Sequence, residues 1–168
     1  VSNATREMSE GELLQIEKAR RLDIQEPVYF EIIKKKTASL IASCCSAGAA
    51  SAGADNETIE KMRLFGEHVG IAFQIKDDLF DYQKTQKTGK PNGIDIKEKK
   101  MTLPLIYMLG QVSALERRKH IHTIKRKSDD TESVAKLISQ VNESGGIEYA
   151  QNRMIEYRDK ALEMLDEF

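Results

Sequence analysis

Residues 70–82 read GIAFQIKDDLFDY, an apolar stretch that ends in three closely spaced aspartates. In an α-helix successive residues are rotated by about 100°, so residues three or four positions apart lie on one side. Asp81 is one turn beyond Asp77 and three residues beyond Asp78. The spacing therefore predicts a helix that gathers three carboxylates at one end.

The residues before the acids predict where one of these carboxylates points. Met62, Gly66, Val69 and Phe73 form one stripe of the same helix, and we expect this stripe to face the protein interior. Asp77 falls roughly 50° from the centre of the stripe. One carboxylate is therefore predicted to lie near the core.

Two interpretations of the acidic end remain open from the spacing alone. Carboxylates that are close together and shielded from water raise one another's pKa unless a cation intervenes. Oxygen ligands without a neighbouring His or Cys favour Mg²⁺ as that cation. Alternatively, the acids form an ordinary solvated helix face, partly neutralised by Lys76 and Lys84, in a chain whose charged residues amount to 32%.

The composition predicts an all-α protein with one hydrophobic core. The chain has 168 residues, of which only three are Pro and ten are Gly. Ala, Leu, Ile, Glu and Lys dominate, and these residues favour helices or fill their buried faces. The periodicity predicts helices over residues 4–18, 26–50, 56–83, 101–109, 113–126, 131–143 and 146–167, with a loop over residues 83–92.

Local signals add detail to these helices. The segment 38–52 consists almost entirely of small residues, which allow a neighbouring helix to pack at short distance. Gly11 is a second candidate for close approach. Asp55 or Asn56 is suited to cap the following helix, and the acidic run 129–132 is a further cap signal.

Charge and cysteine usage limit the possible partners and the setting. With 26 basic and 27 acidic residues the formal net charge is −1, so no uniform field attracts nucleic acid or an anionic membrane. No run of about 18 apolar residues predicts a transmembrane segment. Cys44 and Cys45 are sequence neighbours and cannot link distant parts of the fold, so we expect a reduced, cytoplasmic setting.

Residues 70–82, including the Phe-Gln pair before the acids, closely resemble the second aspartate-rich motif of trans-polyprenyl diphosphate synthases. Gly89-Lys90-Pro91 follows, and the segment 93–104 is similar to the Gly-x-Asp and Lys-x-Thr-Leu-Pro segments of that family, in the same order. Upstream, residues 11–15 and 36–38 resemble two further family segments. The resemblance extends over nearly the whole chain.

The resemblance implies a helical bundle of the isoprenoid synthase type and, as in many members, a homodimer. Residues 1–168 would form the C-terminal portion of a single polyprenyl synthase domain. The first aspartate-rich motif of the family has no counterpart here and would lie upstream of Val1. We therefore expect that the N-terminal half is missing and that this chain alone does not complete the active site.

The resemblance also implies an activity and a cofactor. Enzymes of this family condense isopentenyl diphosphate with an allylic diphosphate to make all-trans polyprenyl diphosphates, and Mg²⁺ ions assist departure of the allylic diphosphate. Carried over by position, the metal ligands would be Asp77, Asp78 and Asp81, with Asp77 also essential for catalysis.

The remaining family residues would bind the allylic diphosphate. An ammonium group is a suitable point donor to phosphate oxygens, so the lysines of the set would also assist catalysis. The set that the resemblance implies is Lys36, Thr37, Gln74, Lys90 and Lys100. Glu12 and Gln15 are weaker candidates that would either line the cavity, orient a lysine or take part in ordinary helix packing.

Two other functions remain open at this stage. The chain is alternatively a non-catalytic helical subunit or scaffold that pairs with an active prenyltransferase, which the absent first acidic motif would explain. A related terpene cyclase is a third reading, although such an enzyme would not need Lys36, Lys90 and Lys100 in this arrangement.

Overall fold

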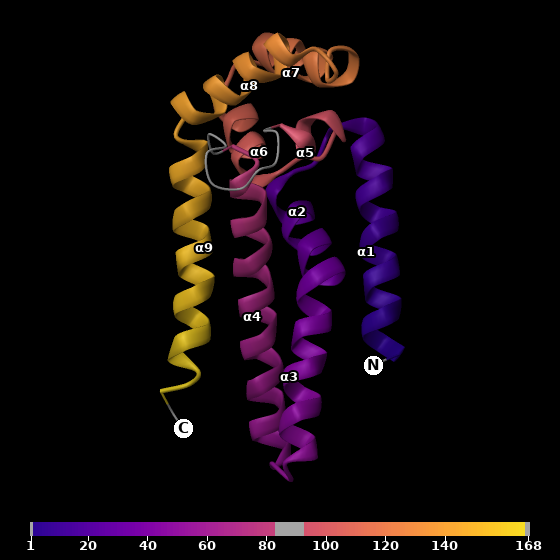
Figure 1. Ribbon diagram of the computed structural model, residues 1–168, viewed down its shortest axis with the longest axis vertical. Coiled ribbons are helices and arrows are strands. Elements are labelled where there is room, and N and C mark those ends of the chain that lie inside the picture. Colours follow the sequence, from indigo (N-terminus) through magenta and orange to yellow (C-terminus); the bar gives the residue numbers. More distant parts are fainter. Residues whose placement is uncertain (1, 83–92, 167–168) are drawn as a thin grey trace. The chain divides into compact units, whose positions relative to one another are not determined.

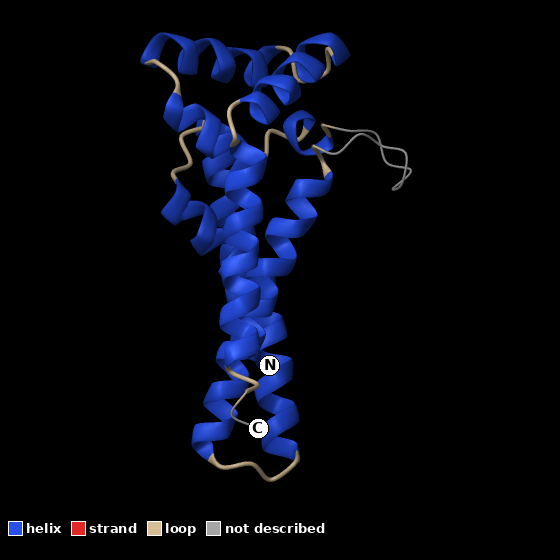
Figure 2. Ribbon diagram, turned by 90° about the vertical axis from the view of Figure 1, so that its left-hand side faces the viewer, coloured by secondary structure: helices blue, strands red, loops and turns tan. Residues whose placement is uncertain are grey.

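The computed structural model describes residues 2–82 and 93–166, and within these ranges every regular element is a helix (Figure 2). This confirms the predicted all-α class. No helix in the described ranges is both long enough and apolar enough to cross a bilayer. The helices are α1 Ser2–Arg21, α2 Glu26–Ile33, the π-helix η1 Lys34–Ala38, α3 Ser39–Ser51, α4 Asn56–Phe80, α5 Ile94–Lys97, α6 Leu103–Gln111, α7 Ala114–Arg126, α8 Thr131–Glu143 and α9 Gly146–Glu163.

Within the described residues the predicted helices are confirmed, with two differences. The helix expected over residues 26–50 is interrupted by the π-helical segment η1. The short helix α5 was not predicted, because four residues show no apolar period. The loop predicted over residues 83–92 lies outside the described residues. The chain divides into two compact units. The first comprises residues 1–15, 30–75 and 152–168, and the second comprises residues 16–29 and 76–151.

In the first unit, glycines bring α4 close to η1 and α3 (Figure 1). A Cβ placed on Gly70 would lie 2.5 Å from Ala38 Cα, and one on Gly66 would lie 2.8 Å from Ala42 Cα. Because glycine has no Cβ, the two backbones can approach to this distance, and a larger residue at either glycine would force them apart. The expectation that the small residues of segment 38–52 permit close packing is confirmed.

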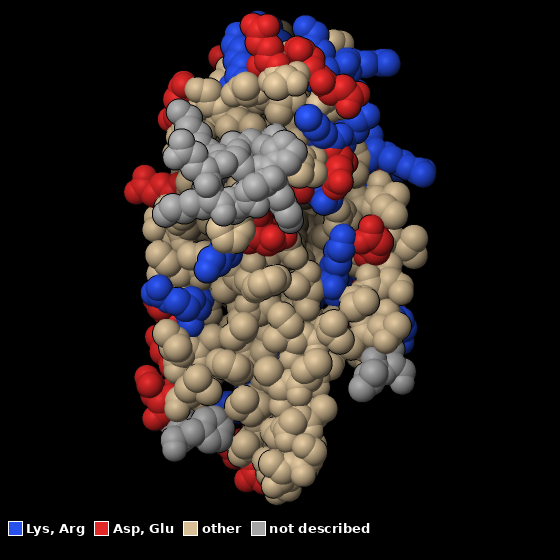
Figure 3. Space-filling view, viewed as in Figure 1, with Lys and Arg blue, Asp and Glu red and all other residues tan. Residues whose placement is uncertain are grey.

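The rest of α3 is also made of small, uncharged residues. No charged side chain occurs from Ser39 to Ser51, and the space-filling view shows little charge over this part of the face (Figure 3). Gly48 lies on the exposed side of α3, and a Cβ there would meet no atom within 4 Å.

Gly70→Ala should lower the free energy of unfolding by about 1–3 kcal/mol, because the new methyl group meets the backbone of Ala38 and one helix must shift. Gly48→Ala is the matched control. It should raise stability by about 0.5–1 kcal/mol, since it adds a better helix former where space is open. Urea denaturation of both variants measures the difference, and equal effects would contradict the close packing.

The buried face of α4 differs from the predicted stripe. Gly66 is buried as expected, but Phe73 is 58% exposed and Asp77 is exposed. The buried positions are instead Gly70, Ile71, Ile75, Asp78 and Leu79, and Tyr82, just beyond the end of the helix, is also buried. The predicted buried face was the one with large apolar side chains such as Phe73. The observed buried face of α4 instead carries its glycines and isoleucines. Successive residues of a helix point about 100° apart. Asp77 and Asp78 therefore face different directions, and Asp78 is the carboxylate near the core.

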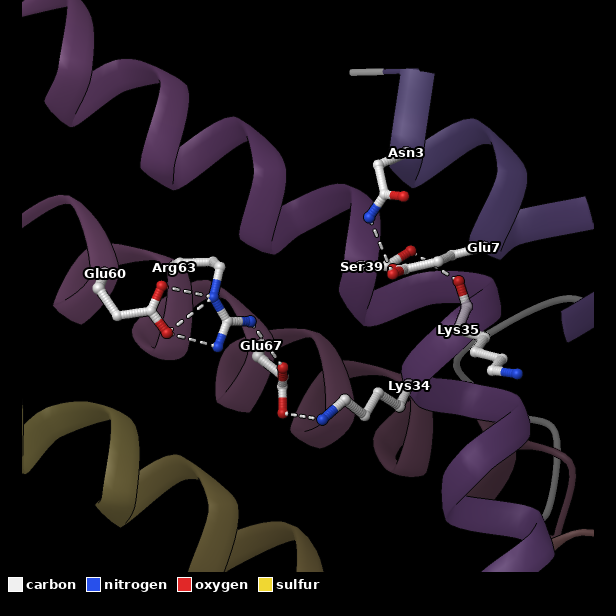
Figure 4. A network of polar contacts seen from close by, with 8 residues as sticks. All are labelled: Asn3, Glu7, Lys34, Lys35, Ser39, Glu60, Arg63 and Glu67. Carbon is white, nitrogen blue, oxygen red and sulfur yellow. Dashed lines mark hydrogen bonds and ion pairs between the residues drawn. The ribbon is translucent and has the colours of Figure 1, made fainter. Parts of the chain in front are cut away.

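A chain of ion pairs joins α4 to η1 in the first unit (Figure 4). Arg63 contacts both Glu60 and Glu67, and the Lys34 ammonium lies 2.7 Å from the other carboxylate oxygen of Glu67. Burial alone would raise the pKa of Glu67, but its hydrogen bonds to Lys34 and Arg63 outweigh burial and lower the pKa below its ordinary value. The two cations therefore stabilise the charged carboxylate.

Glu67→Gln should lower the free energy of unfolding by about 1 kcal/mol at neutral pH, where both cations lose their half-buried partner. Because the folded-state pKa of Glu67 is depressed, its contribution is complete above the ordinary pKa of a glutamate and is lost as the pH falls through the lower folded value. Denaturation curves of the two proteins should therefore converge in acid. A constant difference at all pH values would exclude the ionic origin.

In the second unit, α6 forms the centre of the core. Its residues Leu103, Leu105 and Met108 are almost completely buried. The helices α7 and α8 pack against α6, and their residues Ile124 and Leu137 are also almost completely buried. Gly146, at the first position of α9, approaches the carbonyl oxygen of Pro104, where a Cβ would lie at 2.5 Å. The Asp130 carboxylate accepts a hydrogen bond from the Ser133 amide, which confirms the predicted cap in segment 129–132.

Candidate functional site

Two of the predicted diphosphate-binding residues, Lys36 and Thr37, lie in the π-helical segment η1. The Ser39 amide here donates to the Lys34 carbonyl, five residues earlier rather than four. A π-helical turn adds one residue to the helix and changes the direction of its side chains, and such turns are frequent at functional sites. Sequence reasoning missed this feature, because residues 34–38 carry no Pro or Gly to mark it.

The side chains of η1 are held by neighbours within the first unit. The Lys36 ammonium lies 2.6 Å from a carboxylate oxygen of Glu12 and donates to Gln15 at 3.1 Å. The Thr37 hydroxyl donates to the Gln74 side-chain oxygen on α4 at 2.8 Å. Of the three open readings of Glu12 and Gln15, orientation of a lysine is the one that these contacts support.

Gly11 makes the contacts of Lys36 possible. A Cβ at Gly11 would lie 2.8 Å from the backbone nitrogen of Lys36, so α1 approaches the backbone of η1 directly. This confirms the predicted close approach at Gly11. Because Glu12 follows immediately on the same helix, the approach places its carboxylate within reach of the lysine.

The second unit contains the acidic end of α4, where the three aspartates have different surroundings. Asp77 is exposed, whereas Asp78 is 8% exposed and accepts a hydrogen bond of 2.8 Å from the Tyr29 hydroxyl. Burial, and then the charge of Asp78, raise the pKa of Tyr29 well above its ordinary value. The phenol therefore stays protonated and acts as the donor.

Asp81 bridges the end of α4 and the start of α5. One of its carboxylate oxygens accepts from the Ile94 amide at 2.9 Å and the other accepts from the Asp95 amide at 3.2 Å. The free amides at the first turn of a helix are natural partners for a carboxylate. Burial, followed by the charge of Asp95, raises the pKa of Asp81 despite these donors.

Asp95 in turn holds Lys100, another predicted diphosphate-binding residue. The Lys100 ammonium lies 3.2 Å from an Asp95 oxygen and 2.6 Å from a Glu98 oxygen. Burial raises the pKa of the Asp95 carboxyl, and the Lys100 charge offsets only part of this effect. Burial alone would lower the pKa of Lys100, but hydrogen bonds to Glu98 and Asp95 and their negative charges raise it above the ordinary value. The lysine therefore remains a cation.

The donor set at the end of α4 fits a hard cation. Within residues 2–82 and 93–166 no three His, Cys, Asp or Glu side chains converge as a ready metal cage. Mg²⁺ does not require one, because it commonly uses one or two carboxylates, several waters and substrate phosphates. Asp77 offers an exposed carboxylate and Asp78 a buried one, whereas both carboxylate oxygens of Asp81 accept from backbone amides. Lys90 lies outside the described residues.

The two hydrogen bonds that Asp81 accepts from the first amides of α5 can be tested directly. Asp81→Ala should speed amide exchange at Ile94 and Asp95 by about 10-fold to 100-fold, because each amide loses a charged acceptor. Asp77→Ala, which removes an exposed carboxylate, should leave both rates unchanged. Hydrogen exchange measured by NMR distinguishes the two, and protection that survives in Asp81→Ala would contradict the assignment.

Comparison with known proteins identifies the family. The family model described as polyprenyl synthetase matches residues 1–141, so the chain belongs to the polyprenyl synthetase family. A curated relative, heptaprenyl diphosphate synthase component 2 of Geobacillus stearothermophilus, is 36% identical over 161 residues, which cover 95% of this chain and 49% of that protein. The chain thus spans about half the length of the curated relatives it matches.

Solved structures support the same fold. Geranylgeranyl pyrophosphate synthase from Bacteroides thetaiotaomicron matches with a TM-score of 0.90 at 38% identity, over 99% of this chain and 55% of that one. A polyprenyl synthase from Caulobacter crescentus CB15, complexed with calcium and isoprenyl diphosphate, matches with a TM-score of 0.91 at 34% identity, over 99% and 51%. The expected isoprenoid synthase fold is thereby confirmed.

Proposed function

We propose that the protein containing this chain is a prenyltransferase that joins isopentenyl diphosphate to an allylic diphosphate and forms all-trans polyprenyl diphosphates. The acidic end of α4 supports this proposal, because Asp77 and Asp78 supply carboxylates on adjacent positions in a chain of the polyprenyl synthetase family. The relative from Caulobacter, whose structure holds calcium and isoprenyl diphosphate, supports a divalent cation and a substrate of this class.

In the proposed reaction the bond between C1 and oxygen of the allylic diphosphate breaks, and a new carbon–carbon bond forms to isopentenyl diphosphate. Mg²⁺ bound by Asp77 and Asp78 would supply charge neutralisation for the departing diphosphate. Lys36 and Lys100 would donate to the diphosphate oxygens, with Thr37 and Gln74 as neutral hydrogen-bonding groups. A released diphosphate oxygen accepts the proton lost when the new double bond forms, so no protein base is required.

The lysine contacts suit this role. Lys36 and Lys100 are already held by carboxylates, at 2.6 Å from Glu12 and 2.6 Å from Glu98. Holding a long side chain before the substrate arrives reduces the conformational entropy that binding would otherwise cost. Lys90 belongs to the same proposed set by resemblance alone. A homodimer and a cytoplasmic location also remain part of the proposal.

The proposal predicts that Asp77→Ala in the complete protein lowers turnover by about 100-fold to 1,000-fold, a loss typical of removing one electrostatic contact to a departing group. Stability should change little, because Asp77 is exposed. Asp129→Ala removes an equally exposed aspartate elsewhere in the second unit and is the matched control. The measurement is incorporation of labelled isopentenyl diphosphate with an allylic primer and Mg²⁺. Failure of the unaltered protein to elongate any primer would refute the proposal.

A second candidate is a subunit that acts only with a partner. The relative from Geobacillus is named as component 2 of a heptaprenyl diphosphate synthase, which favours keeping this alternative. Elongation by the purified complete protein alone would exclude it. Reading the coding frame upstream of Val1 for an Asp-Asp-x-x-Asp motif followed by Arg gives an independent test, since its presence supports the enzyme.

A further inference from the structure

One exposed side of α7 concentrates positive charge in a chain whose formal net charge is −1. When successive residues of a helix are rotated by about 100°, six residues of α7 fall within an arc of about 120°. All six are exposed to solvent, four of them are Lys or Arg, and none is acidic. We call this set the basic face of α7, and its residues are Leu115, Arg118, Lys119, His122, Lys125 and Arg126.

The opposite side of α7 is apolar and holds the helix in the second unit. Ile124 is completely buried and lies about 180° from Leu115 around the helix. The helix lies beside α6 and α8, which belong to the same unit (Figure 1). Because the apolar side is taken up by this packing, the basic face points to solvent and needs no rearrangement to meet a partner.

The cations of the basic face lack the carboxylate partners that exposed cations on another helix have. On α9, Arg158 lies 2.7 Å from Asp159, and Lys160 lies 2.6 Å from Glu156. Within residues 2–82 and 93–166, no Lys or Arg of the basic face forms an ion pair. Their charges therefore remain available to an anion outside the chain.

The acids that are near the basic face in sequence are used to cap helices. Glu116 is the one acid of α7, and it forms a capping box with Ser113. The Ser113 hydroxyl and amide donate to the Glu116 carboxylate at 2.6 Å and 3.1 Å. Asp130, beyond the end of α7, accepts from the Ser133 amide at 3.2 Å and caps α8. These carboxylates stabilise helix starts and leave the basic face without a neutralising group of its own.

We propose that the basic face of α7 docks the protein on a membrane surface that contains anionic lipids. From Leu115 to Arg126 the face is about 17 Å long, so its charges form a row that can meet several headgroups at once. Clusters of Lys and Arg on a helix bind anionic headgroups, and each cation near the surface adds about fivefold in affinity. Leu115 is 64% exposed at one end of the row, where it can enter the boundary between headgroups and acyl chains.

A membrane accounts for this face better than a nucleic acid does. Surfaces that bind single strands combine cations with aromatic side chains on which bases stack, and the basic face has no Phe, Tyr or Trp. An exposed leucine gains nothing from a row of phosphates, but it is stabilised when it leaves water for a bilayer. Docking does not depend on the proposed function. Under that function, it would bring a polyprenyl product to the surface into which its apolar chain partitions.

The experiment uses the complete protein and measures its sedimentation with two kinds of vesicle. One kind is phosphatidylcholine alone, and the other is two parts phosphatidylcholine to one part phosphatidylserine. The protein should bind only the mixed vesicles, and binding should fall as the salt concentration rises, because salt screens exposed charges. Arg118→Gln combined with Lys125→Gln should weaken binding by about 25-fold, at about fivefold for each lost charge. Lys119→Gln combined with Arg126→Gln should have the same effect.

Arg158→Gln combined with Lys160→Gln is the matched control, because it removes the same amount of charge from exposed positions on α9. Binding of this variant should stay within about twofold of the unaltered protein, since the basic face is intact. Leu115→Ala should weaken binding without changing its salt dependence, because no charge is lost.

Equal binding to the two kinds of vesicle, or an equal loss in the α9 control, would overturn the inference. Tighter binding to a DNA duplex than to the mixed vesicles would do the same, because the face would then serve nucleic acid. Loss of the fold in both basic-face pairs, measured by far-ultraviolet circular dichroism, would also count against it. A protein that docks on vesicles but elongates no primer would refute the prenyltransferase proposal alone, whereas elongation without docking would refute only the membrane proposal.

Discussion

The crowding of carboxylates at the end of α4 and the start of α5 is the constraint on which the site depends. Each acid has a different relation to its surroundings. Asp77 is open to solvent, Asp78 is buried beneath the Tyr29 hydroxyl, and Asp81 takes up the first amides of α5. Backbone amides therefore donate to the carboxylate of Asp81, and one phenol hydroxyl donates to the carboxylate of Asp78. In the proposed function, a cation and a diphosphate would complete the neutralisation.

Close packing through glycine gives α4 its direction. Gly66 and Gly70 face Ala42 and Ala38, and this contact turns a glycine edge rather than the large apolar side chains toward the neighbouring helix. In the second unit, Asp78 rather than Asp77 is the buried acid, and it is buried where the Tyr29 hydroxyl contacts it.

The lysines show how a local irregularity in a helix and a long-range contact combine. The π-helical segment η1 contains Lys36 and Thr37, while the partners of Lys36 come from α1 through the close approach at Gly11. Lys100 is held in a similar way by Asp95 and Glu98, close to it in sequence. In both cases a flexible cation is restrained by carboxylates that lie outside the aspartate-rich motif.

The sequence by itself determined the helical class, the positions of most helices and the acidic motif, because these depend on residue propensity and on spacing within about one turn. It also indicated the close approach at Gly11 and the caps at Asp55 and Asp130. Only the tertiary structure decided that Phe73 is exposed and Asp78 is buried, that η1 is a π-helix, and that Tyr29 contacts Asp78. These features depend on which distant backbone comes nearest, and short-range periodicity carries no information about a partner 49 residues away.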